Sequence, residues 1–193
     1  MLRRLYNWTM EFAGHRRANV ALAGVSFSES SFFPIPPDVL LIPMVLARRD
    51  KAWQLAGVCT LASILGGLLG YAIGAMLYDT VGLWLMKLYG YTDQVEAFRL
   101  SYAKWGAAII LIKGLLPIPY KIVTITSGFA GYDILAFTVL SAITRGARFY
   151  GEAWALRHYG EPVRHFLERR LELVTTVAAV VIVSGFVLVR YVI

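Results

Sequence analysis

The backbone of this chain must break within one stretch, Glu29-Ser-Ser-Phe-Phe-Pro34-Ile-Pro36-Pro37-Asp38. The stretch lies inside an apolar segment, residues 18–47, that is otherwise typical of a helix. Proline lacks a backbone N–H and moves the residue before it out of helical geometry, so one continuous helix cannot pass through the tract. We therefore predict a hairpin of two short helices over residues 18–47.

A second apolar segment, residues 105–132, is broken in the same way by Pro117-Ile-Pro119. Pro34 and Pro117 lie 83 positions apart, and each tract is followed by a helix rich in small residues. The ionisable residues at matched places are acidic in the first unit and basic in the second: Glu29 and Asp38, against Lys113 and Lys121. The chain is therefore interpreted as two copies of one unit with opposite charge.

The composition indicates the environment of these units. Of the 193 residues, 58% are apolar and only 16% are charged. An average soluble domain is about half apolar and about a quarter charged, so the composition predicts a membrane protein. Cys59 alone cannot form an intramolecular disulfide, and three scattered histidines lack the spacing of a zinc site. We expect no metal and no cofactor.

Three further segments are candidate membrane spans. Residues 52–78 hold no Asp, Glu, Lys, Arg or His over 27 positions, enough at about 1.5 Å per residue to cross about 30 Å of hydrocarbon. Residues 173–189 are uncharged, and residues 134–156 are long enough but carry charges. Broken backbone at membrane depth is tolerated only inside protein or against a watery cavity. The expected fold is an all-α integral membrane protein with two inverted repeats, each a re-entrant helical hairpin followed by a transmembrane helix, plus a C-terminal transmembrane helix.

The basic residues predict the topology of this single membrane domain. With both hairpins re-entrant, eleven of the 19 lysines and arginines fall on one side, four on the other and four within the membrane. The positive-inside rule makes the first side cytoplasmic, with the N-terminus. Residues 1–17 and 157–172 are interpreted as interfacial segments there, and residues 79–104 as an external loop. Anionic headgroups, rather than nucleic acid, are the expected partner.

Two helical faces carry further signals. Gly66, Gly70 and Gly74 recur every four residues and predict close packing of another backbone. Residues at i, i+4, i+7 and i+11 form one polar face of the later helix: Ser141, Arg145, Arg148 and Glu152. Arg148 and Glu152 can pair internally, which leaves Arg145 facing an acid of the first hairpin or an anionic substrate. A substrate pathway and a purely structural charge network are both open readings of this face.

Together these motifs resemble the DedA superfamily of membrane proteins, also described by the SNARE-associated or VTT domain, and in particular its YqaA-like branch. The resemblance covers about residues 25–155 and rests on the first proline tract with its acids, the Gly66-Gly-Leu-Leu-Gly70-Tyr-Ala-Ile-Gly74 helix, and the second proline tract followed by Gly128 and Gly131. It implies two inverted hairpin units and translocation of polyprenyl phosphates or phospholipids. It also implies roles for acids in the first hairpin and bases in the second.

The expected function is therefore a flippase or scramblase that moves an anionic-headgroup lipid across the bacterial inner membrane, with proton coupling as one option. We expect Glu29 and Asp38 to carry protons, and four bases to bind the headgroup: Lys113, Lys121, Arg145 and Arg148. Five prolines are expected to break the hairpins: Pro34, Pro36, Pro37, Pro117 and Pro119. No catalytic residue is expected, because no nucleophile elbow or phosphate-site histidine is present. A membrane scaffold and a small-ion transporter are the alternative functions, and homo-oligomers are compatible with each.

Overall fold

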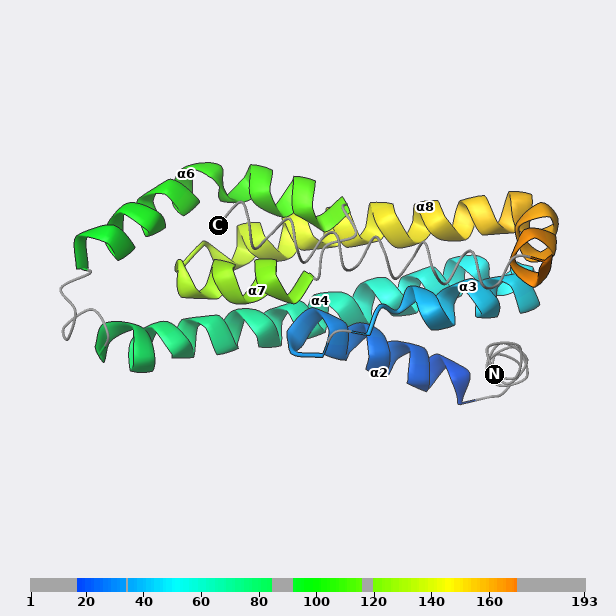
Figure 1. The fold of residues 1–193 in the computed structure, drawn as a ribbon, viewed down its shortest axis with the longest axis horizontal. Coiled ribbons are helices and arrows are strands. Elements are labelled where there is room, and N and C mark those ends of the chain that lie inside the picture. Colours follow the sequence, from blue (N-terminus) through cyan, green and yellow to red (C-terminus); the bar gives the residue numbers. More distant parts are fainter. Residues whose placement is uncertain (1–16, 34, 85–91, 116–119, 170–193) are drawn as a thin grey trace.

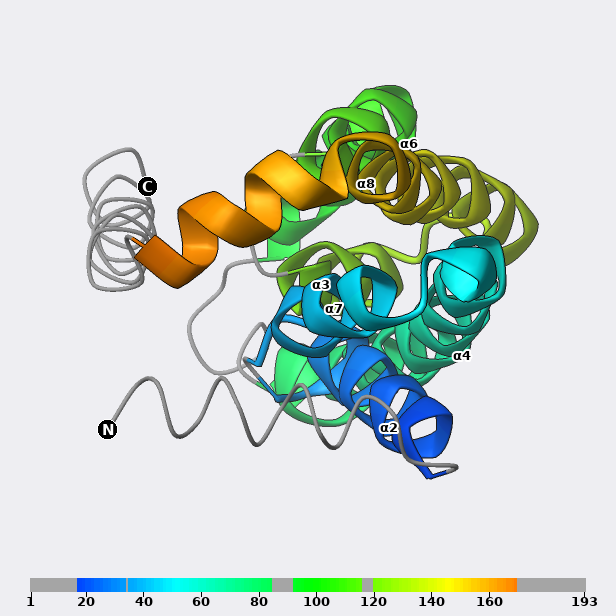
Figure 2. The same cartoon turned by 90° about the vertical axis from the view of Figure 1, so that its right-hand side faces the viewer.

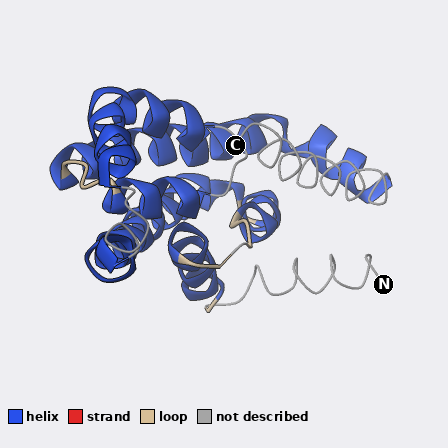
Figure 3. Cartoon of the chain, turned by 60° about the vertical axis from the view of Figure 1, so that its left-hand side comes forward, coloured by secondary structure: helices blue, strands red, loops and turns tan. Residues whose placement is uncertain are grey.

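A computed structural model describes residues 17–33, 35–84, 92–115 and 120–169. These residues form helices and no strand (Figures 1 and 3). In chain order the helices are α2 (Ala18–Ser31), α3 (Asp38–Ala47), α4 (Ala52–Leu77), α6 (Thr92–Leu115), α7 (Tyr120–Phe129) and α8 (Ile134–Arg169). A 3₁₀ turn, Arg49–Lys51, precedes α4, and a π-helical turn, Tyr78–Gly82, follows it. The all-α class predicted from the sequence is confirmed.

The helices form two units of the same order, each with a helix, a break, a helix of 10 residues and a long helix. In Figure 1, α2 runs to the middle of the molecule and α3 returns to the end where α2 began. The pair α6 and α7 does the same from the opposite end, and α4 and α8 run antiparallel to each other. The two hairpins therefore point toward each other, with their helix ends meeting near the centre.

The first break lies where the sequence places it. Helix α2 ends at Ser31 and α3 begins at Asp38, directly after Pro37, whose φ of −65° suits a helix start. Pro36 lies in the same break. Pro34, Pro117, Pro119 and the expected terminal span at 173–189 lie outside the described residues, as do residues 1–16 of the expected N-terminal interfacial segment.

The prediction of an external loop over residues 79–104 is wrong for residues 92–104, because these residues form the first part of α6, which begins at Thr92. The charged residues of this stretch suggested a loop, but Asp93, Glu96 and Lys104 lie on the exposed side of a helix whose other side is anchored. Arg99 Nε donates to the Ala130 carbonyl oxygen at 3.0 Å, and its Nη1 donates to Tyr78 Oη at 2.8 Å. Tyr102 is buried and its hydroxyl lies 2.8 Å from that of Ser127.

The polar-faced span expected over 134–156 is part of a longer helix. Helix α8 has 36 residues and continues through most of the expected interfacial segment at 157–172. Its one non-helical residue, Tyr159 (φ −108°, ψ 16°), marks a kink. Beyond this kink the orange end of α8 turns sideways, away from the bundle (Figure 2). The boundary between the two expected segments is therefore a bend in one helix.

The outer faces of α4 and α8 are apolar. Among the described residues, one helix, Arg49–Thr80, is long and apolar enough to cross a membrane by length and composition. Large apolar side chains at helical spacing are exposed on both helices: Leu61, Leu65, Leu69 and Met76 on α4, and Leu135, Val139 and Ile143 on α8. Contiguous apolar surface of this kind is unusual on a soluble monomer and marks contact with another apolar phase or a partner.

Close helix packing depends on glycines at the centre of the bundle. A Cβ on Gly66 would overlap the carbonyl oxygen of Phe27 in α2. A Cβ on Gly74 would overlap the carbonyl oxygen of Ile125 in α7, and one on Gly128 would overlap that of Tyr71 in α4. Gly70 lies between these points and faces both Ser30 and Thr124. The small-residue face of α4 therefore brings a helix from each hairpin within backbone contact.

Two apolar clusters lie on either side of this centre. The larger joins α2, α3, α4 and the second half of α8, and includes Leu22, Leu41 and Phe149. The smaller joins α6, α7 and the first half of α8 around Ile110 and Phe137. Polar side chains occupy the layer between the clusters, where the hairpins meet.

We expect Gly74→Ala to lower the free energy of unfolding by about 1–3 kcal/mol, because α4 and α7 would have to separate. Gly24→Ala in α2 is the matched control, since a Cβ there meets no atom within 4 Å. It should be neutral or stabilising by about 0.5–1 kcal/mol, because alanine favours a helix over glycine. Circular dichroism during heating in detergent micelles measures both; equal melting temperatures for the two variants would contradict the packing argument.

Candidate functional site

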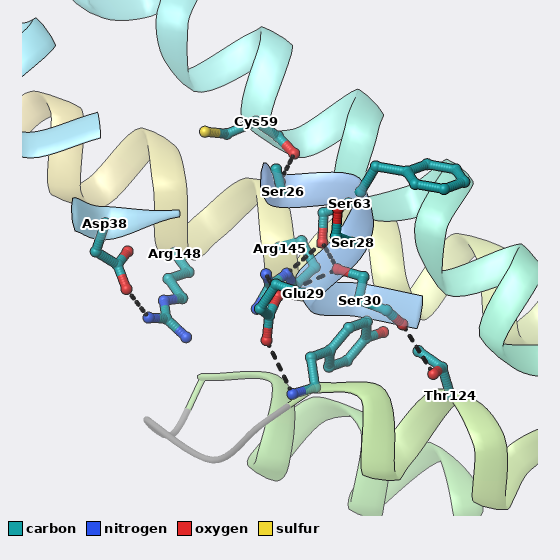
Figure 4. Close-up of polar contacts among 12 residues, drawn as sticks. Ser26, Ser28, Glu29, Ser30, Asp38, Cys59, Ser63, Thr124, Arg145 and Arg148 are labelled. Atoms are coloured by element: carbon teal, nitrogen blue, oxygen red, sulfur yellow. Dashed lines mark hydrogen bonds and ion pairs between the residues drawn. The ribbon is translucent and has the colours of Figure 1, made fainter. Parts of the chain in front are cut away.

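A buried ion pair joins the first hairpin to α8. Arg145 Nη2 lies 2.7 Å from Glu29 Oε2, and Arg145 Nε donates to Ser63 Oγ of α4 at 2.7 Å (Figure 4). The Arg145 side chain is 1% exposed and that of Glu29 is 9% exposed. A charge at such depth is stable only when paired and hydrogen-bonded, so the two residues depend on each other.

Two aromatic rings enclose the same guanidinium. Arg145 Cζ lies 4.8 Å from the ring centroid of Tyr120 and 4.7 Å from that of Phe149. Cation–π contacts strengthen when water is excluded, to about 2 kcal/mol. The rings therefore stabilise the charged guanidinium of Arg145 on sides where it forms no hydrogen bond.

The second oxygen of Glu29 contacts the second hairpin. Glu29 Oε1 accepts a hydrogen bond from the backbone N–H of Tyr120, the first residue of α7, at 3.1 Å. The first turn of a helix has free N–H groups and a partial positive charge, both of which favour a carboxylate. Glu29 thus binds α7 and α8 at once, and it is the point where the two units meet.

Hydroxyl groups extend this contact into a network. The Ser30 and Ser63 hydroxyls lie 2.6 Å apart, and Ser30 Oγ donates to Glu29 Oε2 at 3.2 Å. Thr124 Oγ1 donates to the Ser30 carbonyl oxygen at 3.0 Å, and Tyr120 Oη donates to Ser141 Oγ. Ser30, Ser63, Tyr120 and Thr124 were not singled out from the sequence. Ser63 alone had a signal, because it lies beside the small-residue face of α4.

A second ion pair lies next to the first and is more open. Arg148 Nη2 lies 2.7 Å from Asp38 Oδ2, and both side chains are 22% exposed. Asp38 is also the first residue of α3, where a carboxylate is favoured by the helix N-terminus. The pairing of Arg148 with Glu152 considered from the sequence is therefore wrong: Arg148 points across the bundle to α3 instead of along its own helix.

The two lysines of the second unit do not pair with the acids of the first hairpin, although they stand at matched places with opposite charge. Lys121 Nζ contacts the Phe32 carbonyl oxygen at 3.4 Å, near the C-terminal end of α2, where free carbonyls attract a cation. Lys113 is half-buried in the last turn of α6 and forms no ion pair with any described residue. Arg148 pairs with Asp38 because α8 packs on α3, and Arg145 reaches Glu29 of α2 because both α2 and α8 pack on α4.

An apolar depression lies on the outer side of α2, beside the first break. It has a volume of about 360 Å³ and is lined by Ala21, Gly24, Val25, Ser28, Phe33 and Ile35. Lys121 contacts the carbonyl oxygen of Phe32, and the next residue, Phe33, lines the depression. Within the described ranges, no group of three or more His, Cys, Asp and Glu side chains could hold a metal ion.

The fold and the site together define an all-helical protein in which two opposed broken-helix units meet at a buried charge network. The chain is 34% identical over 185 residues to an uncharacterized protein of Haemophilus influenzae, covering 95% of this chain and 96% of that one. It is 36% identical over 168 residues to an uncharacterized protein homolog of Histophilus somni, covering 85% and 87% of the two chains. The chain belongs to the family of these two proteins. No family model and no solved structure matches it.

Breaking the central pair should destabilise the protein more than removing both of its charges. Glu29→Gln and Arg145→Gln should each lower the free energy of unfolding by about 3–5 kcal/mol, because each leaves one charge buried without its partner. The double variant should recover part of that loss. The outer pair is the control, and Asp38→Asn and Arg148→Gln should each cost less, since water reaches both side chains. Thermal unfolding in micelles tests this, and strictly additive losses at Glu29 and Arg145 would contradict the pairing.

Proposed function

We propose that this protein is an integral membrane transporter, a flippase or scramblase of the DedA superfamily, that moves an anionic-headgroup lipid across the bacterial inner membrane. The observation that carries the proposal is the charge network: ion pairs lie where two opposed hairpins meet, inside a molecule whose outer helical faces are apolar. Ionisable groups at membrane depth are costly and generally mark a substrate or proton pathway.

The arrangement of the helices supports a membrane location. Helices α3 and α7, of 10 residues each, would extend only about 15 Å and thus about half the hydrocarbon thickness, as arms of re-entrant hairpins do. The opposed directions of the units fit inverted repeats, whose broken helices meet near the bilayer midplane. Trp53 and Trp84 are exposed near the two ends of the long helical stretch that contains α4. Aromatic residues are common at such positions, because the ends of a membrane-spanning helix lie at the membrane–water interfaces. The basic surplus supports a cytoplasmic N-terminus under the positive-inside rule.

The outer ion pair supports recognition of a phosphate headgroup. Arg148 is accessible, and a phosphate could replace the Asp38 carboxylate as its bidentate partner. Lys121 of α7 contacts the Phe32 carbonyl oxygen at the end of α2 and would add a point charge there. The apolar depression beside Phe33 would receive part of an acyl chain while the headgroup moves past the hairpin ends.

In this scheme the buried ion pair of Glu29 and Arg145 does not bind the lipid. It couples the movement of the two hairpins instead. Glu29 contacts α7 and α8 together, so a change in its protonation or pairing would alter how the hairpins meet. Movement of one hairpin against the other, around that contact, would expose the outer pair to each side in turn. No bond in the lipid is made or broken in this scheme.

Purified protein in proteoliposomes tests the proposal with a fluorescent anionic phospholipid and a membrane-impermeant quencher. Lys121→Ala should slow lipid movement about tenfold or more, the consequence of losing one charge-assisted contact. Lys104→Ala is the matched control, because that lysine is exposed and lies over Trp105, away from the hairpin ends. Lys121→Arg should retain movement.

Two outcomes would overturn the lipid assignment, and a third would overturn the role of Lys121. Equal rates in empty and protein-containing vesicles would favour the scaffold function. Ion flux across the vesicle membrane without lipid movement would favour a small-ion transporter. Equal lipid movement in wild type and Lys121→Ala would show that the headgroup does not pass this residue.

A further inference from the structure

Glu152 is the third acid of the polar layer, and no arginine pairs with it. Glu29 pairs with Arg145 and Asp38 pairs with Arg148, so the two arginines of α8 are already occupied. Among the described residues, Glu152 forms no ion pair. It lies one turn after Arg148 on the same face of α8, which places its carboxyl group beside the Asp38–Arg148 ion pair.

Asp38 has one oxygen atom that lacks a donor. Its Oδ2 accepts from Arg148, whereas its Oδ1 is buried and has no hydrogen-bond partner. An ionised carboxylate can only accept hydrogen bonds, so two facing carboxylates repel each other. One proton between the two carboxyl groups would turn this repulsion into a hydrogen bond and satisfy the buried oxygen.

We propose that Asp38 and Glu152 share a single proton and form the proton-binding site of this protein, next to Arg148. The charges balance in that state: one carboxylate faces one guanidinium, and the second carboxyl group is neutral. Loss of the proton leaves the trio with one net negative charge. The other groups that face Glu152 are Arg145 of α8 and the Cys59 thiol of α4, and neither removes that imbalance, because Arg145 is already paired with Glu29.

This inference deepens the proposed function and rests on it for its consequence. A phosphate that binds Arg148 would leave Asp38 without its cation, and the carboxyl pair would then hold its proton more strongly. A headgroup at Arg148 and a proton at Asp38 and Glu152 would thus favour each other's binding. Release of the proton would return Asp38 to Arg148 and displace the headgroup.

Infrared difference spectroscopy of the purified protein, between acidic and alkaline buffer, detects the site without any lipid assay. Wild type should lose the C=O stretch of a buried protonated carboxyl group as the pH rises, and the band should shift in D₂O. Glu152→Gln should abolish the band and still fold, because its amide can donate to Asp38. Glu96→Gln, at an exposed glutamate of α6, is the matched control and should keep the band.

Asp38→Asn provides a second variant, in which Glu152 can pair with Arg148 and the band should again disappear. A band that persists in Glu152→Gln, or that is missing from wild type at every pH, would overturn the proposal. Lipid movement is measured separately, and Glu152→Gln should make its rate insensitive to a pH gradient. If wild type moves no lipid but the band behaves as stated, the proton site stands and the proposed function fails.

Discussion

The burial of Arg145 constrains the rest of the structure. An arginine in the interior remains charged, so every direction around its guanidinium must hold a compensating group. Glu29 of α2, Ser63 of α4 and the ring of Tyr120 from α7 supply these groups, while Arg145 itself comes from α8. Four helices from both units must therefore meet at one point. Displacing any of them would leave an unpaired charge in an apolar environment.

The glycine face of α4 makes this meeting possible. Side chains larger than hydrogen at Gly66 or Gly74 would overlap backbone oxygens of α2 and α7 and hold these helices away from the centre. At greater separation, Ser63 would no longer lie within hydrogen-bonding distance of both Arg145 and Ser30. The small residues are therefore linked to the charge network, because the packing distance they allow determines its hydrogen-bond lengths.

The two ion pairs differ in depth, and this difference separates their roles. Arg145 is 1% exposed and has its partners on three helices, whereas Arg148 is 22% exposed and is held by Asp38 across one helix contact. A ligand can compete for the second pair without unfolding the first. The sequence treated both arginines alike as candidates for headgroup binding. The burial of Arg145 fits a role in holding the hairpins together, and under the proposed function the more exposed Arg148 is the one that exchanges partners.

The sequence by itself determined the helical class, the break between α2 and α3 at its proline tract, the repeated order of elements and the close-packing face of α4, because these depend on local backbone chemistry and spacing along one helix. It misjudged residues 92–104, where charges on the outer side of a helix resembled a loop. Only the tertiary structure decided which acid faces which base. Glu29 and Arg145 are separated by 116 positions, and Asp38 and Arg148 by 110, so no periodicity relates them. Those pairings arise from the packing of α8 against the first unit, and that packing also leaves Glu152 beside Asp38.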